Sequence, residues 1–196
     1  MNTRLYSRFG HGLAILVAVL MTFAVGVVAV SEGLPAAVAA LPFAITVCWV
    51  TLLLFWFPEL EVNENGVTIR NVWSEYAVPW AAIQRIDTKY ALTLITQQRT
   101  ITVWSAPAPG RHSVFNASRE QGRHLPESTY LADTIRPGDL PQSESGSAAA
   151  IIRREWERRR DAGEMSNDTR VNQRFRAELA AVTAAVMLLL AASLSL

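Results

Sequence analysis

The chain alternates between long apolar runs and one polar middle section. Three runs without a charged side chain cover Leu13–Val30, Ala36–Phe57 and Leu179–Leu196, and each has at least 18 residues. A helix needs about 20 predominantly apolar residues to cross a hydrocarbon core about 30 Å thick. The pattern therefore predicts a transmembrane helical hairpin over residues 13–57 and a third transmembrane helix over residues 177–196.

The charges beside these runs predict their orientation. Arg4 and Arg8 precede the first run and further arginines flank the polar section, whereas the link Ser31–Pro35 carries no cation. Short flanks rich in Lys and Arg remain in the cytoplasm. We expect a multi-pass protein of the cell membrane, with residues 1–12 and the polar section cytoplasmic and the C-terminus outside. The alternative for Leu13–Val30 is a cleaved signal peptide, although signal h-regions run only about 7–15 residues.

After Pro58 the hydrophobic period changes to two. Leu60 and Val62 alternate with polar residues, and the turn signals Asn63–Gly66 and Thr96–Arg99 separate similar segments. This alternation is typical of antiparallel strands with one buried face. Strands are predicted near residues 59–63, 66–71, 74–79, 83–87, 91–96 and 99–104, within a β-sheet section over residues 58–105. Ile83 and Ile86 alternatively fit a short helical turn.

An amphipathic helix is predicted over residues 147–163. Its apolar side chains fall on one face, namely Ala148, Ala149, Ile151, Ile152 and Trp156. Ser145 or Ser147 is expected to cap its start, and Gly163 to end it. Since so small a sheet is marginal alone, we expect this helix to close the domain by covering the apolar face.

Two polar segments surround this helix. Residues 106–146 are rich in Pro, Gly, Ser and Arg and have little periodicity, which predicts a long flexible insertion. Within it, Tyr130, Leu131 and Ile135 are candidates for local docking. Residues 164–176 are expected to be a linker to the third transmembrane helix. The fold class is therefore an α+β membrane protein.

The β-sheet section contains the runs Pro58–Val62 and Asn65–Asn71, and then Val78-Pro79-Trp80 followed by Ile83 and Ile86. In these residues it resembles the bacterial PH (pleckstrin-homology-like) domain, in the branch named after low-molecular-weight protein antigen 6. The residues taken as the domain signature and core are Gly66, Ile69, Arg70, Asn71, Pro79, Trp80, Ile83 and Trp156. The resemblance implies a curved antiparallel sheet with a C-terminal helix, and it implies no catalytic residue.

Composition narrows the function classes. The 18 Lys and Arg residues nearly balance the 17 Asp and Glu residues, so no net field attracts nucleic acid. Cys48 is the only cysteine, which excludes an intramolecular disulfide. His11, His112 and His124 lack metal-ligand spacing, and the sequence has no glycine-rich phosphate loop or nucleophile elbow. We expect no enzyme activity, no cofactor, no metal and no small-molecule substrate.

The sharpest candidate site is a run of arginines on the amphipathic helix, Arg153, Arg154, Arg158, Arg159 and Arg160. Cations beside an anionic leaflet contribute about 1 kcal/mol each to membrane binding, so the run could contact lipid. The alternative is that these arginines only determine the membrane topology and form a solvated face of the helix. The sequence therefore favours a scaffolding or interaction module for an unknown membrane or envelope protein, and leaves an anionic-lipid sensor as the second function.

Overall fold

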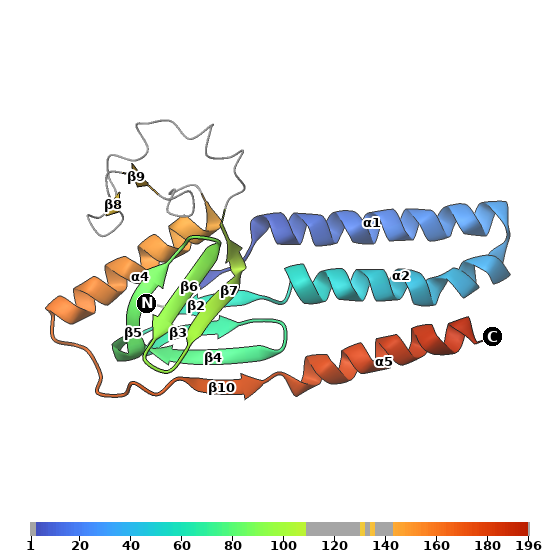
Figure 1. Ribbon diagram of the computed structural model, residues 1–196. Helices are drawn as coiled ribbons and strands as arrows, with labels where there is room; N and C mark the ends of the chain where they lie inside the picture. The colour runs from blue at the N-terminus through green and yellow to red at the C-terminus, as the bar shows by residue number, and fades with distance from the viewer. Residues whose placement is uncertain (1–2, 109–129, 132–133, 136–142, 196) are drawn as a thin grey trace. The chain divides into compact units, whose positions relative to one another are not determined.

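The computed structural model describes residues 3–108, 130–131, 134–135 and 143–195 (Figure 1). These residues form two compact units. We call them the β unit, made of residues 1–6, 59–71 and 75–174, and the helical unit, made of residues 7–58, 72–74 and 175–196. Each unit is described by itself.

The helical unit contains three helices, α1 (Arg8–Ser31), α2 (Leu34–Phe55) and α5 (Ala177–Leu194). All three are long and apolar enough to cross a membrane, as the sequence predicts. Helix α2 packs against both α1 and α5. Ser7 caps the start of α1: its side-chain oxygen accepts a hydrogen bond from the Gly10 amide at 2.9 Å, and this satisfies one of the free amides of the first turn.

Side chains tie the helices of this unit together. The Trp49 indole on α2 donates to the Thr183 hydroxyl on α5 at 3.0 Å. The unit also includes the chain reversal Val72–Ser74. Val72 is only 2% exposed and forms a buried cluster with Leu53 and Leu179. The ends of α2 and α5 therefore pack on a residue that the sequence places inside the β-sheet section.

The β unit is built on two antiparallel arrays of strands. One sheet has the order β1-β2-β3-β4-β10 and the other the order β5-β6-β7. The first sheet comprises β1 (Thr3–Leu5), β2 (Glu59–Val62), β3 (Gly66–Arg70), β4 (Ser74–Pro79) and β10 (Asn172–Phe175). The second comprises β5 (Ile83–Asp87), β6 (Ala91–Thr96) and β7 (Thr100–Pro107). A short 3-10 turn, η1 (Trp80–Ala82), leads from β4 into β5.

Helix α4 (Glu144–Asp161) covers the second sheet, and it contacts β5, β6 and β7 (Figure 1). The helix buries Ala148, Ala149 and Ile152 in the core of the unit. The strands contribute alternate residues to the same core, among them Leu60, Ile69, Leu92 and Val103. The amphipathic pattern and the period-2 pattern thus meet in one apolar interior, as predicted.

The structure corrects several boundaries. Helix α4 begins at Glu144, and its cap is Ser143, whose hydroxyl accepts from the Gly146 amide at 2.9 Å. The predicted caps Ser145 and Ser147 are wrong, because both lie inside the helix. Gly163 has a φ of 68° just after the helix, so the predicted end is confirmed. Ile83 and Ile86 lie on a strand, and the helical turn is η1, immediately before them.

Two segments predicted as tails or linkers are strands of the first sheet. Strand β1 pairs with β2 in the register Thr3 with Val62 and Leu5 with Leu60. Strand β10 adds to β4, and just before it the Val171 amide donates to the Gln98 side chain at 3.2 Å. These pairings put residues before α1 and before α5 into the β unit.

The predicted flexible insertion falls largely outside the described residues. Its first two residues end β7, and its last residues cap and begin α4. Between them the structure describes only β8 (Tyr130–Leu131) and β9 (Thr134–Ile135), which pair with each other. The expected docking residues Tyr130, Leu131 and Ile135 therefore lie in this small hairpin.

Candidate functional site

Signature residues and their neighbours stabilise the turn of the β2–β3 hairpin. Gly66 has a φ of 157°, and a Cβ at this position would lie 2.1 Å from the Val78 carbonyl oxygen. The Asn63 side chain accepts from the amides of Asn65 and Gly66, both at 3.0 Å. The Trp80 indole donates to the Asn63 carbonyl at 3.2 Å. Glycine is needed at position 66 because strand β4 passes too close for any side chain.

Arg70 is the centre of a charge network on the first sheet. Its guanidinium lies 3.0 Å from Glu59 and 3.1 Å from Glu61 on β2, and 3.6 Å from Glu75 on β4. Arg4 on β1 lies 3.6 Å from Glu59 and 3.7 Å from Glu61. Burial alone would lower the pKa of Arg70, but the carboxylates outweigh it and raise that pKa. The network links β1, β2, β3 and β4.

The other signature residues also have structural roles. The Asn71 amide group donates to the Thr102 carbonyl at 2.8 Å, and its oxygen accepts from the Trp104 amide at 3.1 Å. Asn71 therefore joins the end of β3 to β7. Ile69 and Ile83 lie in the core, and Pro79 pairs with Gly66 across the β3–β4 ladder. This part of the sequence signature explains the fold and offers no reacting group.

The arginines of α4 mostly bind groups of their own domain. Arg158 makes two contacts with the Glu155 carboxylate, at 2.8 and 3.0 Å, and one with Glu164 at 3.2 Å. Arg159 lies 2.7 Å from Glu155, with its guanidinium 5.6 Å from the centre of the Trp80 ring. Hydrogen bonds from Arg158 and Arg159 hold the pKa of Glu155 at about 2, below its ordinary value of 4.5.

The remaining arginines divide into two kinds. Arg160 lies 3.2 Å from Asp161 and over the ring of Trp156. Arg153 donates to the carbonyl of Ile86 on β5 at 3.3 Å. Arg154 is exposed and has no hydrogen bond or ion pair among the described residues. The run that the sequence shows as a positive stretch is therefore largely neutralised by carboxylates of the β unit.

Two hollows of the β unit are lined by described residues. The larger is polar and is lined by side chains of both charges, including Glu64, Arg159, Glu164 and Asp168, together with Trp80. The smaller, of about 180 Å³, lies between β5 and α4. Among the described residues, no group of three or more His, Cys, Asp or Glu side chains could hold a metal ion. Both hollows have room for a bound ligand. The residues that line them include no recognisable set of catalytic groups.

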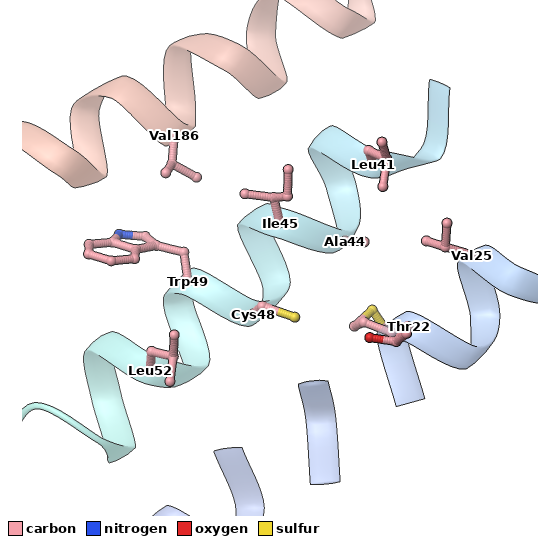
Figure 2. A pocket seen from close by; sticks show the side chains of 10 residues that line it. Thr22, Val25, Leu41, Ala44, Ile45, Cys48, Trp49, Leu52 and Val186 are labelled. Carbon is pink, nitrogen blue, oxygen red and sulfur yellow. The ribbon is translucent and has the colours of Figure 1, made fainter. Parts of the chain in front are cut away.

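The helical unit has an apolar pocket of about 390 Å³ (Figure 2). Most of its wall comes from α2, including Ala44, Cys48 and Trp49, while α1 adds Thr22 and α5 adds Val186. The Thr22 hydroxyl donates a hydrogen bond to the Ala18 carbonyl at 2.8 Å. The pocket therefore suits an apolar chain.

These features define a class, namely a membrane protein with three apolar helices and a small two-sheet β domain closed by one helix. Residues 57–132 match the family model of the bacterial PH domain, so the chain carries a domain of that family and the predicted resemblance is confirmed. Domains of this kind are generally non-catalytic interaction modules. The branch named after low-molecular-weight protein antigen 6 stays a prediction. No curated protein and no solved structure matches the chain.

Proposed function

We propose that the protein is a non-enzymatic interaction or scaffolding module at the cytoplasmic face of the cell membrane. In this function the β unit binds a membrane or envelope protein, and the helices anchor it in the bilayer. The observation that supports protein binding over lipid binding is the pairing of Arg158, Arg159 and Arg160 with carboxylates of the same domain. Charges that are already paired contribute less to attraction by an anionic leaflet.

Strand pairing supports the proposed topology. Strand β1 precedes α1 and β2 follows α2, yet the two pair side by side. Two membrane crossings return a chain to the side where it started, so the pairing fits an N-terminus and a β unit on the same side. Arginine-rich flanks favour the cytoplasm for that side, and a third crossing then puts the C-terminus outside.

Gentle crosslinking of the full chain in its native membrane tests the interaction function. We expect specific recovery of a membrane or envelope protein with the wild-type chain. A matched control is Ile152→Asp, which places a charge in the buried core and unfolds the β unit while leaving the apolar helices intact. Recovery of nothing beyond background, or of the same proteins with the control, would contradict the proposal.

The second candidate is an anionic-lipid sensor, favoured by the free charge of Arg154 and the arginine excess of α4. The full chain in nanodiscs of neutral or anionic lipid would distinguish it, with hydrogen exchange of the α4 amides as the readout. A lipid sensor would show protection only in anionic lipid, and salt would remove it because the Debye length is about 8 Å at physiological ionic strength. Protection unchanged when Arg153, Arg154, Arg158, Arg159 and Arg160 are all replaced by Gln would exclude this function.

A further inference from the structure

Strand β5 has one open side. The order β5-β6-β7 places β5 at the edge of the second sheet, where β6 is its only paired strand among the described residues. Its other side faces the groove of about 180 Å³ that α4 closes with Arg153, Trp156 and Glu157. The edge of a sheet presents unpaired backbone groups that another strand can bind. We call this hollow the edge groove.

A side chain of α4 donates a hydrogen bond to the backbone of β5. The Ile86 carbonyl accepts a hydrogen bond from the Arg153 guanidinium at 3.3 Å. Ile86 and Arg153 both line the edge groove. The contact shows that a side chain of α4 reaches a backbone carbonyl of β5.

The edge groove contains a buried donor without an acceptor among the described residues. The Trp156 indole nitrogen is buried and has no hydrogen-bond partner in this part of the chain. Leaving a buried donor unsatisfied has a free-energy cost. A ligand that brings a carbonyl or carboxylate oxygen to this nitrogen would remove that cost.

The charge of the edge groove favours an acidic ligand. Its charged lining residues are Arg85, Arg153 and Glu157, so arginine exceeds carboxylate by one. Arg85 is exposed, and its side chain has no ion pair or hydrogen bond among the described residues. A carboxylate that approached along β5 would therefore meet one guanidinium with no competing partner.

We propose that the edge groove binds an extended acidic segment of the partner protein, which adds to β5 as a further strand. Backbone hydrogen bonds to β5 give affinity in this mode, and pockets for alternate side chains give specificity. Arg85 recognises a carboxylate of the segment, and the Trp156 indole donates to an oxygen of it. The inference rests on the proposed interaction function and names the chemistry of its partner.

Fluorescence anisotropy with the full chain in nanodiscs tests the assignment. The probe is a labelled peptide of alternating valine and glutamate, and a valine–lysine peptide is its counterpart. We expect the acidic peptide to bind with a Kd below about 1 mM. Arg85→Gln should weaken it about tenfold, since one hydrogen bond to a charged group contributes roughly 1.5–3 kcal/mol. Trp156→Phe, which keeps the ring and removes the donor, should weaken it several-fold.

The matched control is Arg154→Gln, which also removes one arginine charge but from α4, at a residue outside the groove lining. It should change the affinity by less than about twofold. The proposal is overturned by absence of binding at about 1 mM, by equal binding of the lysine peptide, or by equal weakening with Arg154→Gln and Arg85→Gln.

Crosslinking separates this assignment from the interaction function itself. If the wild-type chain recovers a specific partner and Arg85→Gln recovers it equally well, the interaction function stands and the edge groove is not its site. If neither chain recovers a partner, the interaction function fails. Loss of the partner with Arg85→Gln but not with Arg154→Gln supports both.

Discussion

Replacing Gly66 by alanine should strongly destabilise the β unit. A Cβ at this position would lie 2.1 Å from the Val78 oxygen and 2.9 Å from the Pro79 Cα. Both are backbone atoms of β4, so no side chain can rotate away. Either β3 and β4 move apart or the turn at Asn63 opens.

The cost follows from two contributions. Overpacking of a fitted interior costs about 1–3 kcal/mol, and a non-glycine residue at positive φ adds about 1 kcal/mol. We expect Gly66→Ala to lower the free energy of unfolding of the β unit by about 2–4 kcal/mol, against a total of about 5–15 kcal/mol for an ordinary domain. The melting temperature should fall by roughly 10–20 °C.

Thermal unfolding of the full chain in detergent, followed by hydrogen exchange of the β3 and β4 amides, measures this change. The matched control is Gly163→Ala, because Gly163 also has positive φ, 68°, but nothing lies within 4 Å of an added Cβ. It should cost only about 1 kcal/mol. Equal losses for the two variants would refute the argument from close strand approach.

Three other substitutions test separate contacts. Trp156→Ala should lower the stability of the β unit by about 2–3 kcal/mol, less than for a fully buried tryptophan, and an unchanged melting temperature would remove α4 from the fold. Glu155→Gln should cost about 1–2 kcal/mol at pH 7 after allowance for solvent screening. Because the pKa of Glu155 is lowered from 4.5 to about 2, this stabilisation is present above pH 4.5 and is lost as the pH falls toward 2, so wild-type and variant melting curves should converge there. Val72→Ala should loosen the buried contact with Leu53 and Leu179 by about 1–2 kcal/mol, seen as faster exchange at the start of α5, and no change would show that the contact is not stabilising.

Local signals made most of the fold predictable. The three apolar runs, the alternation at Leu60 and Val62 and the turn at Asn63–Gly66 are each contained in one continuous segment of the sequence. The strand β1 has only three residues, too few for a period to be visible, and all four residues of β10 are exposed, so that strand has no buried face to produce an alternation. Their partners are distant in sequence, so only the three-dimensional pairing identifies them as strands.

The sequence allows some contacts of the α4 side chains to be predicted and leaves others unpredictable. Glu155 stands three and four residues before Arg158 and Arg159, and this spacing places the three side chains on one helix face. This spacing in the sequence therefore predicts these ion pairs. The placement of Arg153 and Trp156 beside β5 could not be read in the same way, because it depends on how α4 packs on the second sheet.

The pairing of β1 with β2 has a consequence for how the protein is made. A ribosome releases Thr3–Leu5 first, and their partner strand Glu59–Val62 only after both helices of the hairpin. A hairpin inserted with a single crossing would leave the two strands in different compartments, with β2 lacking its neighbour and Arg4 separated from Glu59 and Glu61. Under the proposed topology, the first sheet can therefore form completely only when both helices of the hairpin cross the membrane.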